Sequence, residues 1–275
     1  MADDRSPLEA VLGRDRLVIG GALGVLAALA WSYVVWLAAD MDMGGMDMSD
    51  FRMIPAGMGL MAPAVVPWSA LEFGFVFAMW AVMMVGMMTP SAAPMILIYA
   101  RVGRQAAVTD KPFAATGWFV VGYLLSWTGF ALIATAAQWA LDRAALLDSM
   151  MASASNRFGG LVLVAAGIYQ WTRFKEVCLA KCQSPFLFIQ QYGGFRRDIA
   201  GSLLLGLRHG AYCVGCCWAL MALLFVAGVM NVLWIAALGL LILLEKITAR
   251  GRLISRLAGV ALIVAGVWLL LPATQ

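Results

Sequence analysis

The sequence predicts an all-α, polytopic transmembrane helical bundle of about seven helices, with the N-terminus in the cytoplasm. Hydrophobic residues make up 63% of the 275 residues and charged residues only 12%, about half of the usual share in soluble proteins. Several uncharged runs are close to the length that crosses a bilayer. Such runs are expected to be helices, because unpaired backbone groups are too costly in lipid.

Seven apolar segments are expected to form the bundle. They cover roughly residues 17–38, 71–100, 113–140, 158–174, 202–230, 232–246 and 257–271. Residues 1–16 are expected to form a cytoplasmic N-terminal segment. Residues 17–275 are expected to form a single transmembrane helical domain, with a Met- and Asp-rich outer loop at 40–70.

Lys and Arg are distributed unevenly among the segments between these spans. With the N-terminus inside, fifteen of the nineteen basic residues lie on the cytoplasmic side, and only Arg52, Arg143 and Arg157 lie outside. Positive charge accumulates on the cytoplasmic side of short loops, so this orientation is favoured. We therefore expect a multi-pass protein of a bacterial inner (cytoplasmic) membrane. A nucleic-acid partner is not expected, because the basic residues sit in short loops between apolar spans.

The predicted outer loop contains a run in which Met alternates with Asp. Its methionines are Met41, Met43, Met46 and Met48. Thioethers are soft ligands that suit copper(I), and they stay ligands in an oxidising compartment. The glycines of the run would let a short segment wrap an ion. The run therefore predicts metal capture, and the alternative is a flexible loop that happens to use Met.

Five methionines gather on the second predicted span, ahead of two prolines. They are Met79, Met83, Met84, Met87 and Met88. The first, second and fourth recur every four residues and so line one helical face. Pro90 and Pro94 should kink or interrupt the helix, and such breaks in membranes usually line a cavity or a site. The pattern predicts a thioether path. The alternative is that Met serves here as an adaptable packing residue.

Two of the five cysteines, Cys178 and Cys182, lie in the longest predicted inner loop. A spacing of four would place both thiols on one face of a helix. Lys175 and Lys181 are expected to lower the pKa values of these thiols. A static disulfide is disfavoured in a reducing cytoplasm.

The strongest site pattern is the stretch from His209 to Trp218. It contains the only His of the chain and three cysteines, Cys213, Cys216 and Cys217. On a helix these four side chains fall within one broad face. They are the ligand types that soft or borderline metals prefer. One helix rarely supplies a whole ligand set, so we expect the cysteines of the inner loop or the Met-rich span to contribute. The alternative is that Cys packs as a small hydrophobe.

Small and charged residues flank this pattern. Gly210 and Gly215 should let another helix approach closely. Glu245 ends the sixth predicted span and is expected to pair with Arg208 or His209 across helices, or to act as an interfacial anchor.

At these residues the chain resembles a bacterial family of uncharacterised integral membrane proteins that are predicted to bind metal. The resemblance rests on Met83-Met84 with Pro90 and Pro94, Cys178 and Cys182, the stretch from His209 to Trp218 with Leu220-Met221, the stretch from Met230 to Trp234, and Glu245-Lys246. It covers roughly residues 72–248 and is most specific from Cys213 to Trp218. The resemblance implies a metal site, whereas the Met–Asp run lies outside the shared region.

The sequence therefore favours a membrane protein that binds a soft metal, with copper(I) expected first, for uptake, handover or homeostasis. Its expected partners are the lipid bilayer, the metal ion, and a metallochaperone or metalloenzyme. A membrane thiol oxidoreductase ranks second, and a non-catalytic assembly subunit third. An ATP-driven pump is not expected, because the chain has no phosphate-binding GxxxxGK[ST] loop.

The expected topology places the C-terminus outside. Reporter fusions after Arg104 and after Arg197 should give cytoplasmic signals, and a fusion after Gln275 should give an external signal, because the basic residues are distributed in this way. A cytoplasmic signal from the last fusion would contradict an odd number of spans.

Overall fold

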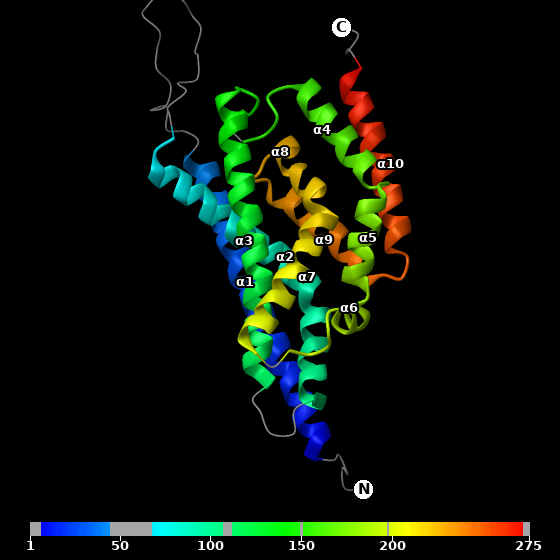
Figure 1. Ribbon diagram of the computed structural model, residues 1–275. Coiled ribbons are helices and arrows are strands. Elements are labelled where there is room, and N and C mark those ends of the chain that lie inside the picture. Colours follow the sequence, from blue (N-terminus) through cyan, green and yellow to red (C-terminus); the bar gives the residue numbers. More distant parts are fainter. Residues whose placement is uncertain (1–6, 45–67, 107–111, 149–150, 197, 272–275) are drawn as a thin grey trace, which may run out of the picture.

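The computed structural model of the chain describes residues 7–44, 68–106, 112–148, 151–196 and 198–271, and the ordered elements of this part are helices (Figure 1). In chain order they are α1 (Pro7–Gly44), α2 (Ala70–Ala106), α3 (Pro112–Arg143), α4 (Asn156–Tyr169), α5 (Arg173–Gln183), α6 (Pro185–Gln191), α7 (Ile199–Ala222), α8 (Leu224–Ala227), α9 (Val232–Ile247) and α10 (Gly251–Leu270). The predicted all-α class is confirmed.

Five helical segments of the described chain are long and apolar enough to cross a membrane. They are Leu17–Ala39, Ala70–Gly103, Ala115–Arg143, Ile199–Ala227 and Gly251–Leu270. The sequence predicted about seven membrane-spanning helices, which is more than the five that meet this criterion of length and composition in the described residues. The fourth and sixth predicted spans correspond to α4 and α9, which have 14 and 16 residues. At about 1.5 Å per residue, neither reaches the roughly 30 Å of a hydrocarbon core.

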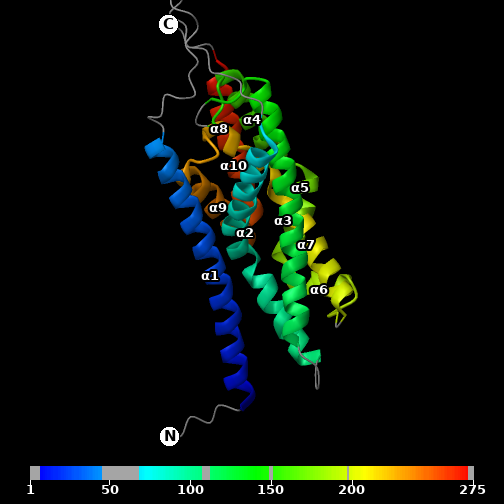
Figure 2. The same ribbon diagram turned by 90° about the vertical axis from the view of Figure 1, so that its left-hand side faces the viewer.

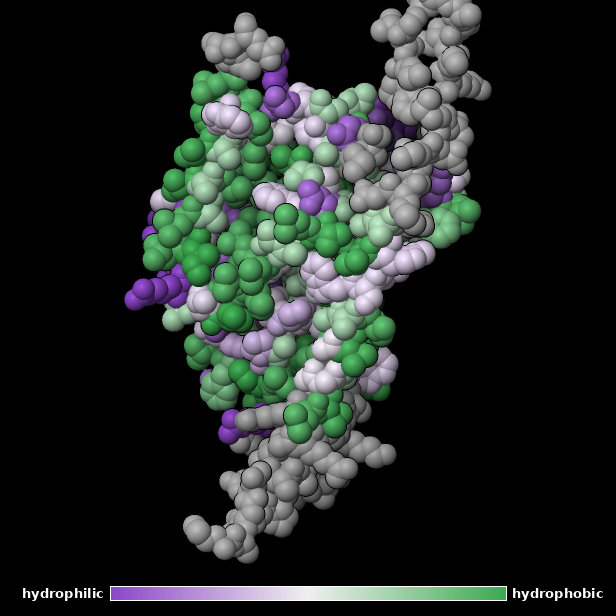
Figure 3. Space-filling view, turned by 180° about the vertical axis from the view of Figure 1, so that it is seen from behind, coloured by the Kyte–Doolittle hydropathy of each residue, from purple (hydrophilic) through white to green (hydrophobic). Residues whose placement is uncertain are grey.

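Large apolar side chains remain on the outside of the bundle. Leu17, Leu233, Val264 and Trp268 are each more than 60% exposed. Figure 3 shows hydrophobic residues over much of one face, with hydrophilic residues in smaller patches. Soluble monomers rarely expose apolar surface on this scale. The surface is therefore compatible with a protein embedded in lipid.

Helices α3 and α7 approach each other through glycines. A Cβ added at Gly206 would lie 2.0 Å from the carbonyl oxygen of Phe119, and one at Gly122 would lie 2.1 Å from that of Leu203. A Cβ at Gly210 would lie 2.6 Å from the Ser126 side chain, which confirms the close approach expected there. Only glycine permits backbones this close, so these residues fix how α7 sits against α3.

Helices α4 and α10 form a second glycine-mediated pair. A Cβ at Gly160 would lie 2.9 Å from the carbonyl oxygen of Gly266, and one at Gly167 would lie 2.7 Å from that of Gly259. The contact is reciprocal, because α10 approaches α4 just as closely at the same two levels. The short α4 therefore has a partner along its length, although it is too short to span a bilayer alone.

Helix α2 bends without being interrupted. Pro90 and Pro94 lie inside its continuous helical span, and its two ends run in different directions in Figures 1 and 2. Thr89 Oγ1 donates to the carbonyl oxygen of Val85 at 2.6 Å, and bonds of this kind bend helices. The predicted kink is thus present, whereas an interruption is not.

Side chains cap the helices that carry the candidate site. Thr172 Oγ1 accepts from the Lys175 amide at the start of α5, Asp198 accepts from the Gly201 amide at the start of α7, and Asn231 accepts from the Trp234 amide at the start of α9. Each cap satisfies a backbone donor that the helix itself leaves free. The starts of α5, α7 and α9 are therefore encoded locally.

The contact between α3 and α7 leads to a stability prediction. We expect Gly206→Ala to destabilise the protein by about 1–3 kcal/mol or more, because the added methyl meets backbone that cannot move away alone. Unfolding in detergent, followed by circular dichroism, measures this. Gly117→Ala on α3 is the control, since nothing lies within 4 Å of its Cβ. Equal unfolding midpoints for the two variants would contradict the prediction.

Candidate metal centre

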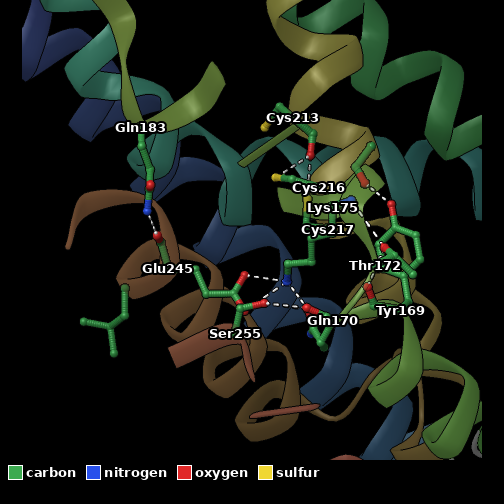
Figure 4. A network of polar contacts seen from close by, with 12 residues as sticks. Tyr169, Gln170, Thr172, Lys175, Gln183, Cys213, Cys216, Cys217, Glu245 and Ser255 are labelled. Atoms are coloured by element: carbon green, nitrogen blue, oxygen red, sulfur yellow. Dashed lines mark hydrogen bonds and ion pairs between the residues drawn. The ribbon is translucent and has the colours of Figure 1, made fainter. Parts of the chain in front are cut away.

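Helix α7 carries the central set of candidate ligands. His209, Cys213, Cys216 and Cys217 are all buried on it, and Figure 4 shows the three cysteines close together on this helix. The face that the spacing predicted is therefore the one that points into the bundle. The five cysteines of the chain are all free thiols.

Helix α5 brings a further thiol to this set. The Cys182 thiol forms hydrogen bonds with the thiols of Cys213 and Cys216. Cys178 lies one turn earlier on α5, and its Sγ would be 3.0 Å from a Cβ at Gly215. The structure therefore places both inner-loop cysteines next to the stretch from His209 to Trp218. Gly215 is small enough to admit α5, as expected.

Three polar residues complete the surroundings of Cys213. Lys246 Nζ on α9 donates to Cys213 Sγ at 2.8 Å and to Ser91 Oγ at 3.1 Å. The Tyr123 hydroxyl on α3 lies 3.1 Å from the same sulfur. Sequence reasoning gave Ser91 and Tyr123 no role and named Lys246 only as part of the family resemblance. The available signal was Lys246 itself, a charged residue at the end of an apolar run, which marks a functional candidate in membranes.

His209 lies in a cage of aromatic rings next to the thiols. Its ring centroid is 6.0 Å from that of Phe119, 5.9 Å from Tyr123 and 5.2 Å from Phe188. Its buried Nδ1 has no hydrogen-bond partner within the described residues. Buried nitrogens usually have one. His209 therefore presents a nitrogen that is available to a ligand.

A buried ion pair ties α5 to α9. Lys175 Nζ lies 2.8 Å from Glu245 Oε2, and each side chain is only 1% exposed. Lys175 also donates to Gln170, whose Oε1 accepts from Ser255 on α10 at 3.1 Å (Figure 4). The network holds α5, and with it Cys182, against α9. The expected pairing of Glu245 with Arg208 or His209 is therefore wrong.

The expected effect of the two lysines on the inner-loop thiols is also wrong. Lys175 is bonded to Glu245 and Gln170, and Lys181 is bonded to Gln191. Burial raises the pKa of the Cys178 thiol to about 11. Hydrogen bonds with Cys213 and Cys216 raise the pKa of Cys182 well above its usual value. Both shifts disfavour the thiolate form.

The methionines of α2 are buried beside this cluster. Met79, Met83, Met84, Met87 and Met88 are all 5% exposed or less. The Met88 carbonyl oxygen accepts from the Tyr123 hydroxyl at 3.3 Å. Met87 Cε would lie 3.8 Å from a Cβ at Gly239 on α9. The Met-rich face therefore lies in the core and ends next to the residues around Cys213.

The methionines of the predicted outer loop are only partly covered by the structure. Met41 and Met43 belong to the last turn of α1, which continues to Gly44. The sequence had predicted that this helix ends before the loop at 40–70. The side chains of Met41 and Met43 are not described. Met46 and Met48 lie outside the described residues.

The thiols do not enclose an ion in this conformation. Within the described ranges, no three or more His, Cys, Asp or Glu side chains form an arrangement that could hold a metal. The Cys216 and Cys217 thiols instead donate to the Cys213 carbonyl oxygen, at 3.1 and 2.9 Å. Binding at these sulfurs would require the two side chains to turn away from that carbonyl.

The fold and the cluster together define an all-helical protein with buried thiols and membrane-length helices. A protein family described as PpoB2, copper chaperone, matches residues 77–269 of the chain. The match covers more than half of the chain, so the protein belongs to this copper chaperone family. The matched region includes the methionines of α2 and all five cysteines. No curated protein and no solved structure matches the chain.

The ion pair between α5 and α9 leads to a second stability prediction. We expect Glu245→Ala to cost about 3–5 kcal/mol, because it leaves the Lys175 ammonium buried without its partner. Unfolding in detergent measures the loss.

The exposed pair between Glu176 and Arg256 provides the matched control, with side chains 32% and 51% exposed. We expect Glu176→Ala to cost less than about 1 kcal/mol, because water screens such pairs. Equal losses of unfolding free energy in the two variants would show that the buried pair stabilises the protein no more than the exposed pair does.

Proposed function

We propose that this protein is an integral membrane copper chaperone that binds copper(I) at a thiol cluster inside its helical bundle and passes it to a partner. The proposed principal ligands are Cys213 and Cys216, with Cys182, Cys217 and His209 beside them. The metal is cargo, received on one side of the site and released on the other.

The observation that carries this proposal is the meeting of thiols from two helices. The Cys182 thiol on α5 interacts with the thiols of Cys213 and Cys216 on α7, and both residues on α7 are 1% exposed. Sulfur ligands select copper(I) over harder ions. Membership of a copper chaperone family gives the same metal independently.

A membrane location and an N-in, C-out topology fit the arrangement of the helices. Five helical segments of the described residues are long and apolar enough to cross a membrane. Helix α1 begins at one end of the bundle and α10 ends at the opposite end (Figure 1). The distribution of Lys and Arg favours the cytoplasm for the first of these ends.

The methionines provide a proposed route for the ion. In this proposal Met41, Met43, Met46 and Met48 collect copper(I) outside, and Met83, Met84, Met87 and Met88 lead it along α2. Thioethers bind copper(I) without holding a charge of their own, so an ion can move from one to the next. The route would end beside Tyr123, which bonds to both the Met88 carbonyl and Cys213.

Release is proposed at α5. Cys182 is only partly buried, unlike the three cysteines of α7, so it is the sulfur that a partner reaches first. A metallochaperone or metalloenzyme with its own thiols would take the ion by ligand exchange. The distribution of Lys and Arg assigns the segment that contains α5 to the cytoplasmic side.

A thiol oxidoreductase is the second candidate function. The contact between Cys182 and the thiols of Cys213 and Cys216 would also let a disulfide form between α5 and α7. Thiol counts before and after treatment with a mild oxidant distinguish the two functions. A copper chaperone should lose its metal when the thiols are oxidised, whereas an oxidoreductase should cycle between the two states without metal.

The proposal predicts that Cys213→Ser combined with Cys216→Ser abolishes stoichiometric copper(I) binding and leaves the protein folded. Serine keeps the size of the side chain but replaces the soft sulfur with a hard oxygen. Metal analysis of protein purified without oxygen measures the bound copper. Cys178→Ser is the control, since the Cys178 thiol lies against Gly215 and has no such bond to Cys213. One equivalent of copper retained in the double variant would move the site to α2 or to the inner-loop cysteines.

A further inference from the structure

Lys246 is a buried cation without a carboxylate partner in the described part of the chain. The residue is only 7% exposed, and its hydrogen-bond partners are Cys213 Sγ and Ser91 Oγ. The neighbouring carboxylate, Glu245, is already paired with Lys175. A buried charge is costly unless an opposite charge compensates it. Of the two groups to which Lys246 donates within the described residues, the sulfur of Cys213 is the one that can carry the compensating negative charge.

The same charges decide which ion the cluster can hold. Cysteine binds metals as the thiolate, so the two principal ligands, Cys213 and Cys216, bring two negative charges. Lys246 contributes one positive charge, so one further positive charge makes the site neutral. A monovalent ion makes the buried site neutral, whereas a divalent ion leaves it with an excess positive charge.

We propose that Lys246 is a specificity-determining residue that makes the thiol cluster selective for monovalent copper(I) over divalent thiophilic ions such as zinc. This inference rests on the proposed function, because it assumes that the cluster is the metal site. Lys246 acts by charge and position and is not itself a ligand. Ser91, which follows the first proline of α2, holds the ammonium next to Cys213.

The other groups around the cluster leave this charge balance unchanged. The Tyr123 hydroxyl contacts Cys213 and is neutral in its ordinary state, and Ser91 has no charge. The nearby Lys175 and Glu245 cancel each other. His209 faces Phe119, Tyr123 and Phe188 and has no carboxylate beside it in the described residues. Lys246 is therefore the fixed charge that sets the preference.

The test compares silver(I), a monovalent mimic of copper(I) that is stable in air, with cadmium(II), a divalent ion that also prefers sulfur. The full-length protein is purified in detergent with its thiols reduced, and the two ions compete for it in a titration. Cadmium–thiolate absorption in the ultraviolet reports the divalent ion. The quantity measured is the ratio of silver(I) to cadmium(II) affinity.

We expect Lys246→Met to lower this ratio by about 10- to 100-fold, because removing one charge within a few ångströms favours the divalent ion more strongly. Lys246→Arg keeps the charge and should keep the ratio. Lys181→Met is the matched control. It removes a lysine next to Cys182 in the sequence, but this lysine is bonded to Gln191 instead of a thiol. Its ratio should equal that of the unchanged protein.

Lys246→Gln provides a second neutral variant, whose amide can still donate to Cys213 and Ser91 if the methionine variant does not fold. Size-exclusion chromatography checks that each variant is folded. A ratio that is unchanged in the folded neutral variants overturns the role of Lys246 alone. An unchanged protein that binds no silver(I) at its thiols overturns the proposed function instead.

Discussion

The near-contact of two helix backbones, α3 and α7, is the constraint on which the site depends. Gly206, Gly122 and Gly210 remove the side chains that would otherwise hold these helices apart. Because α7 lies so close to α3, the Tyr123 hydroxyl reaches Cys213. Helices α5 and α9 also pack against α7 and bring Cys182 and Lys246 to the same cluster. A helix spaced normally from α3 would leave Cys213 without its tyrosine and would displace the other two.

Polar chemistry inside the bundle is divided between two adjacent residues of α9. Glu245 points to Lys175 and fastens α5, while Lys246 points to Cys213 and supplies charge to the cluster. Neighbours on a helix diverge by about 100°, so one short segment serves two different contacts. Fastening α5 matters to the site, since Cys182 is carried on the same helix only seven residues after Lys175. The buried pair and the thiol cluster are therefore parts of one arrangement.

Periodicity and composition were sufficient to predict much of the fold. The apolar runs predicted the all-α class, and each expected span overlaps a helix. The face formed by His209, Cys213, Cys216 and Cys217 also follows directly from helical spacing. The number of membrane-spanning helices was predicted less well. Hydropathy does not reveal that the helix beginning in the apolar run at Phe158 ends at Tyr169. A new helix, α5, then begins after a turn capped by Thr172. Long-range partners were beyond the sequence. Nothing in the local pattern distinguishes Lys175 from Arg208 as the partner of Glu245, because that choice depends on how α5 folds back against α9.

The pairing of α4 with α10 has a consequence for the order in which the protein is assembled during synthesis. Helix α4 is too short to cross a bilayer by itself, and the glycines that dock it belong to α10, which leaves the ribosome after the other described helices. Lys175, just after α4, likewise waits for Glu245, which lies 70 positions further along the chain. The first three helices can pack early, whereas the half of the bundle that contains α4 and α5 closes only after α9 and α10 have been synthesised. The thiol cluster is therefore a late product of biogenesis, and a nascent chain that stalls before α10 would carry its cysteines in an unfinished and reactive setting.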